Sequence, residues 1–310
     1  MIALLASALA LSAAPMDRHL ADHAFVLASA VDTPFLQRHM ALGQGVGVLF
    51  VPAYTYPGIP EPLSLKLGGL TEGLSGQLPV GDWGAVELGL SGVVHTSLDS
   101  ATALFVGASA SYEVRTGLRV RLHRGQRVQV SGRVGLRRAD EVGVLPAALV
   151  EALLDDPQDT LPDLLKGRLT RQLITTRRVW QGTLGFSWAV AVSPVVGLQG
   201  STSLRIGPSV LETAVGTFTG ALIQVGGGAA LDIRPKGGPV GVQVGLRDRV
   251  EQEVGATDVL SDRNRVLAPI QLYYDRGEMV IGVVTAFASS VNKGQRDVEA
   301  TLEAKLTAWF

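Results

Sequence analysis

The chain ends in the stretch Asp297-Val298-Glu299-Ala300-Thr301-Leu302-Glu303-Ala304-Lys305-Leu306-Thr307-Ala308-Trp309-Phe310. Every even position is apolar, and every odd position before Trp309 is polar or charged. Alternation with a period of two residues is typical of a β-strand with one apolar and one polar face. A soluble protein seldom ends on such a strand with an aromatic last residue, so the rest of the chain must show whether the pattern repeats.

This segment resembles the C-terminal signal strand of bacterial outer-membrane β-barrels, which typically ends in Phe after alternating apolar residues. The positions that carry the resemblance are Leu302, Ala304, Leu306, Ala308 and Phe310. The resemblance implies an outer-membrane location, with Leu302, Leu306 and Phe310 as the membrane-insertion signal. It also implies two partners, which are the surrounding outer-membrane lipid and a barrel-assembly machinery that binds the C-terminal strand.

The composition agrees with a membrane barrel. Of 310 residues, 46% are hydrophobic and only 18% are charged, and the mean hydropathy is +0.27. No internal stretch approaches the roughly 20 apolar residues that a membrane helix needs, which leaves a large core or lipid-facing residues spread over many strands. The lack of cysteine excludes disulfides and thiolate metal sites. The net charge of −1 indicates no nucleic-acid partner, and the sequence predicts no cofactor.

The first residues are predicted to direct export. An apolar run followed by Ser12-Ala13-Ala14 predicts a signal peptide over residues 1–14, with a buried N-terminal helix as the alternative. Cleavage after Ala10 or Ala13 stays open. Residues 15–42 are predicted to be an N-terminal periplasmic segment that is helical in part. His19 and His23 have a spacing that suits a metal, but a solvated segment explains them better.

Residues 43–310 repeat the alternation of the final stretch. They predict an all-β fold, a transmembrane antiparallel up-and-down β-barrel of about twelve strands. From Leu104 onward nearly all charges within strands lie on the polar face, with Arg138 and Asp248 as exceptions. Charge at mid-membrane on the lipid face would cost roughly 2–4 kcal/mol. A change of phase at Gly68-Gly69 predicts a β-bulge.

The expected connections alternate in length, which is the outer-membrane pattern if Phe310 lies on the periplasmic side. Short turns are predicted on that side, and the longer extracellular loops are predicted at residues 52–62, 98–101, 139–177, 207–217, 251–264 and 290–296. The alternation stops in 139–177, where leucines at helical spacing predict a helical insert. This insert is expected to be a self-packing pair or lid, or else a docking site for a partner.

The inward face carries charges that are candidates for a selectivity site. The candidates are Arg115, Arg119, Arg121, Arg127, Arg133, Arg137, Arg205, Arg247, Glu299 and Glu303. A wall of arginines beside acidic groups would set a field across a narrow lumen and favour anionic solutes. The alternative is that these charges pair across strands and fill the interior, as side chains do in small barrels.

A short motif raises the question of catalysis. Gly92-Val93-Val94-His95-Thr96-Ser97 resembles part of the Gly-x-x-His-x-Ser motif of outer-membrane phospholipases and lipid A deacylases. Leu98-Asp99 replaces the Asn-Gly that usually follows, and the alternation points His95 and Ser97 inward rather than toward lipid. Chance alternation explains the motif better, and the chain is not expected to be an enzyme.

Three functions are therefore carried forward. The first is a narrow porin-like channel for small solutes, with anions favoured. The second is a plugged structural or interaction barrel that acts through its extracellular helical loop. The third and least favoured is a lipid-acting hydrolase at His95 and Ser97.

Overall fold

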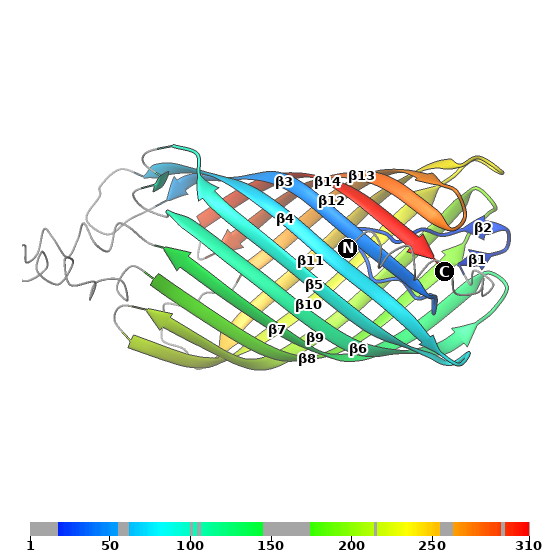
Figure 1. Cartoon of the computed structure of the whole chain (residues 1–310), viewed down its shortest axis with the longest axis horizontal. Coiled ribbons are helices and arrows are strands. Elements are labelled where there is room, and N and C mark those ends of the chain that lie inside the picture. The colour runs from blue at the N-terminus through cyan, green and yellow to red at the C-terminus, as the bar shows by residue number, and fades with distance from the viewer. Residues whose placement is uncertain are drawn as a thin grey trace, which may run out of the picture.

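A computed structural model describes residues 18–54, 62–99, 102–103, 107–144, 174–213, 216–254, 263–292 and 295–309. In this part of the chain twelve antiparallel strands form a closed barrel, in which each pairs with the next along the chain and β14 pairs with β3 (Figure 1). The barrel strands are β3 (His39–Tyr54), β4 (Leu63–Val80), β5 (Gly84–Ser97), β6 (Ala108–Arg124), β7 (Val128–Val144), β8 (Ile174–Ala191), β9 (Val196–Thr213), β10 (Gly216–Ile233), β11 (Val240–Val254), β12 (Arg263–Asp275), β13 (Met279–Asn292) and β14 (Gln295–Trp309).

The outer wall of the barrel is apolar and exposed. Leu70, Leu272 and Phe287 are 63%, 60% and 60% exposed, while inward-facing neighbours on the same strands are buried, with Gln271, Ala286 and Ala288 at 3%, 7% and 5% exposed. A soluble monomer seldom exposes a continuous apolar belt, whereas a lipid-facing barrel requires one. Closure leaves no strand edge with unpaired backbone groups in the hydrocarbon. Belt and fold together are those of a β-barrel that spans a membrane. Within the residues described, no helix is long and apolar enough to cross a membrane.

The two ends of the barrel differ as the alternating connections predict. Short turns join the strands at the end where β14 finishes, which we call the periplasmic end, and two of them place Gly81 and Gly277 at positive φ. At the extracellular end, five of the six expected loops are shorter than predicted, because the strands that flank them are longer; β9, for example, ends at Thr213 and β10 begins at Gly216. The loop expected at 98–101 is longer, because β6 begins only at Ala108.

Two further expectations change. The ends of the predicted helical insert are strand, since β7 reaches Val144 and β8 begins at Ile174; the rest of the insert lies outside the described residues. The bulge expected at Gly68-Gly69 is wrong, because β4 pairs there without a shift. Leu65 and Leu67, 1% and 5% exposed, point inward from an unbroken strand, and these apolar inward residues imitate a change of phase in the sequence.

Residues 18–38 run inside the periplasmic end of the barrel (Figure 1). They contain two short strands, β1 (His19–Leu20) and β2 (His23–Ala24), and no helix, so the expectation of partial helix is wrong here. We call these residues the N-terminal segment. Its apolar side chains pack against the inner wall in three small clusters, which include Phe25, Val26 and Ala30.

Glycines in the wall let the N-terminal segment approach closely. A methyl group at Gly197 would lie 2.5 Å from both the Phe25 ring and His23 Nε2, and one at Gly245 would lie 2.5 Å from Ala30 Cβ. Carbon atoms in contact need about 3.5–4.0 Å, so no side chain fits at either place. The wall is therefore shaped to hold this segment.

Candidate functional site: a floor and a cationic cavity in the lumen

The N-terminal segment is anchored at the periplasmic rim by a buried ion pair. Arg18 Nη1 and Nη2 donate to the two Asp275 carboxylate oxygens at 2.7 and 2.8 Å, and the two side chains are 2% and 0% exposed. Nη2 also donates to the Gly277 carbonyl at 3.0 Å, and the guanidinium lies 4.5 Å from the Trp309 ring centroid. Arg234 makes a second pair with Asp275. Bidentate pairs of this kind are the strong form of ion pairing.

A set of inward glutamines holds the backbone of the N-terminal segment. Five such glutamines, each near the periplasmic end of a different strand and at most 3% exposed, hydrogen-bond the segment. The bonds are Gln129 Nε2 to Pro34 O at 2.9 Å, Gln199 Nε2 and Gln243 Nε2 to Val26 O at 3.0 and 3.4 Å, Gln37 N to Gln77 Oε1 at 2.6 Å, and Ser29 Oγ to Gln271 Oε1 at 2.9 Å. An extended chain inside a dry barrel must satisfy its carbonyls and amides, and these glutamines replace a strand partner.

A further buried carboxylate lies under the segment. Asp232, 0% exposed, accepts hydrogen bonds from Tyr273 Oη at 2.6 Å and Gln243 Nε2 at 3.0 Å. His23 Nε2 of the segment lies 3.7 Å from the same carboxylate. The floor of the lumen is thus an assembled polar and apolar contact, which indicates a defined docked position for the segment.

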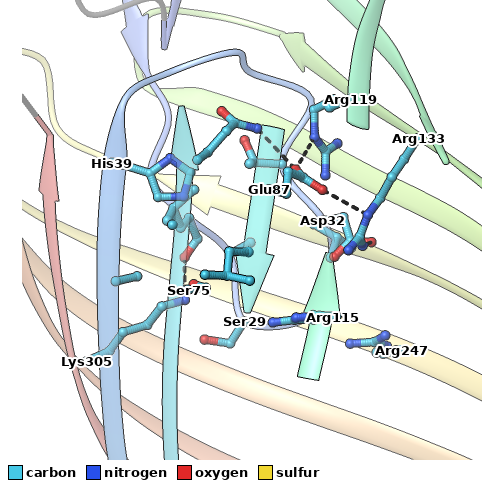
Figure 2. A pocket seen from close by; sticks show the side chains of 18 of the residues that line it. Ser29, Asp32, His39, Ser75, Glu87, Arg115, Arg119, Arg133, Arg247 and Lys305 are labelled. Carbon is cyan, nitrogen blue, oxygen red and sulfur yellow. Dashed lines mark hydrogen bonds and ion pairs between the residues drawn. The ribbon is translucent and has the colours of Figure 1, made fainter. Parts of the chain in front are cut away.

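Above this floor lies a cavity of about 240 Å³, walled on one side by the segment and on the other by the barrel. Glu87 from β5 stands at its centre, 2.6 Å from Arg119 Nε and 2.8 Å from Arg133 Nε. Asp32, near the deepest part of the segment, is 3.2 Å from Arg133 Nη1. Figure 2 shows these four side chains as one group, with Arg115 and Arg247 beyond them.

The arginines around the cavity lower the pKa of the Asp32 carboxyl group. Burial by itself would raise the pKa of Asp32, but the positive charges of Arg133, Arg119, Arg247 and Arg115 outweigh it and hold that pKa well below its usual range. Asp32 is therefore a carboxylate at any ordinary pH, and it counts as one full negative charge in the cavity.

The charges of the cavity do not cancel. The cations that line it are Arg115, Arg119, Arg133, Arg247 and Lys305, and the carboxylates are Asp32, Glu87 and Glu303. Five cations against three carboxylates give a formal charge of +2. Arg119 and Arg133 are committed to Glu87 and Asp32. Among the described residues, neither Arg115 nor Arg247 lies within ion-pair distance of a carboxylate.

The predicted selectivity residues thus fall into two groups. Arg115, Arg119, Arg133, Arg247 and Glu303 meet at this cavity. The others lie elsewhere: Arg137 pairs with Glu113 at 2.8 Å, Arg205 donates to Gln224 at 2.9 Å, Glu299 pairs with Arg265, Arg121 is half-buried beside a register shift, and Arg127 is exposed in the turn before β7. The sequence places Glu87 and Lys305 on the inward face without counting them among the selectivity candidates, and it gives Asp32 no role. Inward alternation was a signal for Glu87 and Lys305, but nothing in the pattern placed Asp32 inside the barrel.

The remaining sequence features carry less chemistry. Leu302 and Leu306 face outward on β14, as an insertion signal requires, while Phe310 lies outside the described residues. His95 points inward, against Gly69, and no hydrogen bond joins it to Ser97 in the described chain. No group of His, Cys, Asp and Glu among the described residues could hold a metal ion.

Comparison with known proteins supports the fold. No protein-family model matches the chain, and no curated protein matches its sequence. The translocator domain of autotransporter NalP from Neisseria meningitidis is similar in structure, with a TM-score of 0.56, 12% identity and 90% of each chain covered. The COG4313 outer membrane channel from Pseudomonas putida F1 gives a TM-score of 0.52 at 9% identity, with 92% of this chain and 100% of that chain covered. The chain therefore has the fold of bacterial outer-membrane β-barrels.

Proposed function

We propose that the chain is a narrow outer-membrane conduit for small anionic solutes, with the N-terminal segment as its constriction. The observation that supports this most is the +2 formal charge of the cavity above the segment. A water-filled lumen whose narrowest part is positive raises the local concentration of anions and excludes cations. The structural likeness to an outer membrane channel agrees with a conduit but leaves the solute open.

A second candidate is a closed barrel whose role is structural or lies in binding a partner. The buried anchor between Arg18 and Asp275 and the five glutamine contacts favour it, because they hold the segment across the periplasmic end. A barrel of this kind would act through the helical insert that the sequence predicts. The two candidates differ in one property, which is whether ions pass through the folded protein.

Single-channel recording in a planar bilayer separates them. For a conduit we expect stable current steps, and in a salt gradient a reversal potential that shows anion preference. The double substitution Arg115→Gln and Arg247→Gln should move the reversal potential toward zero, because it removes two cavity cations that have no carboxylate within ion-pair distance among the described residues. Arg138→Gln is the matched control, since Arg138 lies on the outer wall, 5.1 Å from the Trp180 ring, and should leave selectivity unchanged.

Two results would contradict the conduit. A folded barrel that conducts no current in the wild type favours the closed barrel. Current steps whose reversal potential does not respond to the double substitution would mean that the cavity does not set selectivity. Deleting residues 146–174 then tests whether the extracellular insert, rather than the N-terminal segment, blocks the lumen.

A further inference from the structure

The Asp32 carboxylate belongs to the N-terminal segment, but the site that binds it is formed by strands of the barrel wall. It comes from the N-terminal segment, whereas every cation that holds it belongs to the strands, namely Arg115 and Arg119 on β6, Arg133 on β7 and Arg247 on β11. Glu87, from β5, shares Arg133 with it. Arginine recognises carboxylates through paired N–H donors, so the wall presents a carboxylate site that the chain itself fills.

The other contacts of the segment around Asp32 are neutral: Val31 packs in the apolar cluster with Ala230, and Gln129 and Ser131 donate to the Pro34 carbonyl. The Asp32 amide donates to Ser201 Oγ at 3.1 Å, and Ser187 Oγ donates to the Thr33 carbonyl at 3.2 Å. Both are single hydrogen bonds between neutral groups, worth about 1 kcal/mol each. The ion pair with Arg133 is therefore the main specific interaction at this point of the segment.

We propose that the cavity is a binding site for small organic dicarboxylates, and that Asp32 occupies part of it as an intramolecular substitute for one of their carboxylates. This rests on the proposed function in taking the lumen as the route of the solute. One solute carboxylate takes the place of the Asp32 carboxylate at Arg133. The second lies between Arg115 and Arg247, which lack a carboxylate partner in the described structure.

The class of anion follows from the charges. A dicarboxylate that displaces Asp32 puts two negative charges on a wall with four arginines, one lysine and the carboxylates Glu87 and Glu303. The resulting balance is closer to neutral than with a single carboxylate. Planar carboxylates suit the arginine forks, and the site already holds two of them, Glu87 between Arg119 Nε and Arg133 Nε, and Asp32 against Arg133 Nη1.

Displacement also releases the segment. Once a solute holds Arg133, the middle of the segment loses its ion pair and keeps its neutral hydrogen bonds and apolar packing, while the Arg18 anchor stays in place. Binding and loosening of the constriction are then the same event, because the segment and the solute compete for one site.

The test is binding of succinate to the full exported chain in detergent, measured by calorimetry, with acetate, inorganic phosphate and uncharged succinamide as comparison probes. We expect succinate to bind best and succinamide not at all. Asp32→Asn removes the internal competitor and should tighten succinate binding roughly tenfold, whereas Arg115→Gln with Arg247→Gln should abolish it. Asp22→Asn is the matched control, because Asp22 belongs to the same segment but is exposed in the β1–β2 turn.

Trypsin supplies a second readout, since the segment is bounded by Arg18 and Arg38. Succinate should speed cleavage at Arg38 in the wild type and have no effect in Asp32→Asn, in which the segment is already loosened. Equal or weaker succinate binding by Asp32→Asn would overturn the proposal, as would equal binding of phosphate. Current without succinate binding refutes the site alone, and succinate binding without current refutes the conduit alone.

Discussion

At the periplasmic end of the lumen, Arg18 and Asp275 face each other with side chains that are 2% and 0% exposed. Near the extracellular end, Arg265 and Glu299 form a similar pair with side chains that are 33% and 20% exposed. The same alternating strands supply the wall in both places. Water reaches the upper pair and screens it, but it is excluded from the lower pair by the N-terminal segment. An arginine–carboxylate pair therefore adds little stability above the cavity, whereas the pair below the cavity holds the N-terminal segment in place.

This comparison implies that the N-terminal segment, and not the charged residues nearer the extracellular end, limits the passage of ions through the lumen. Deleting residues 18–37 should raise single-channel conductance several-fold, because it removes the segment that fills the periplasmic end of the lumen. In the wild type this segment is held there by the glutamines and by the Arg18–Asp275 anchor. The barrel strands begin at His39, so the deletion leaves their pairing intact. Conductance would be measured beside the wild type and the variant lacking 146–174. Unchanged conductance after the first deletion would show that the constriction lies elsewhere.

The two ion pairs should differ strongly when they are broken. Asp275→Asn leaves both Arg18 and Arg234 without a carboxylate in a dry site and should lower the free energy of unfolding by about 3–5 kcal/mol. Arg265→Gln, the matched change in the upper lumen, should cost about 0–1 kcal/mol because the pair is partly exposed. Denaturant unfolding in micelles measures both. Equal losses would mean that the floor is as wet as the upper lumen.

Arg18→Gln refines the same experiment. It should cost less than Asp275→Asn, since Asp275 keeps its pair with Arg234 and a hydrogen bond from the Gly277 amide at 2.7 Å. Its main effect should be faster proteolysis of the N-terminal segment with little change in barrel unfolding. If Arg18→Gln lowered the free energy of unfolding more than Asp275→Asn does, the anchor would depend mainly on the contacts of Arg18 with the Trp309 ring and the Phe25 carbonyl, and less on the carboxylate.

The sequence predicts the barrel well because one physical rule governs every strand. Lipid outside and polar groups inside force the period of two, and this pattern continues through β14 to its last described residue, Trp309. The rule fails where the interior is not wet. Leu65 and Leu67 point inward, so their positions predict a change of phase that the strand does not have. In the sequence alone, an apolar residue on the inner face cannot be distinguished from one on the outer face.

The cavity is only half predictable for the same reason. Arg115, Arg119, Arg133 and Arg247 follow from alternation, but Asp32 belongs to a segment without period, which docks through backbone carbonyls and small apolar side chains. A signal did exist in the wall. Five inward glutamines near the periplasmic strand ends, with glycines at 197 and 245, describe a surface built to bind an extended chain. Residue periodicity does not show which part of the chain binds this surface, because that depends on the three-dimensional path of the chain.

The smallest expected effect is that of pH on the Asp32 contact. An undocked aspartate has a pKa near 3.9, and the arginines hold the docked value lower, so the ion pair contributes fully above about pH 4 and is lost only as pH falls through the docked pKa. Because other ionisable groups, among them Glu87 and Asp275, also lie against the segment, the quantity to follow is the difference in segment proteolysis rate between wild type and Asp32→Asn. This difference should stay constant from about pH 7 to about pH 5 and shrink only in stronger acid. A difference that already shrinks near pH 5 would mean that docking raises the pKa of Asp32 above its free value, so that burial outweighs the charges of the arginines.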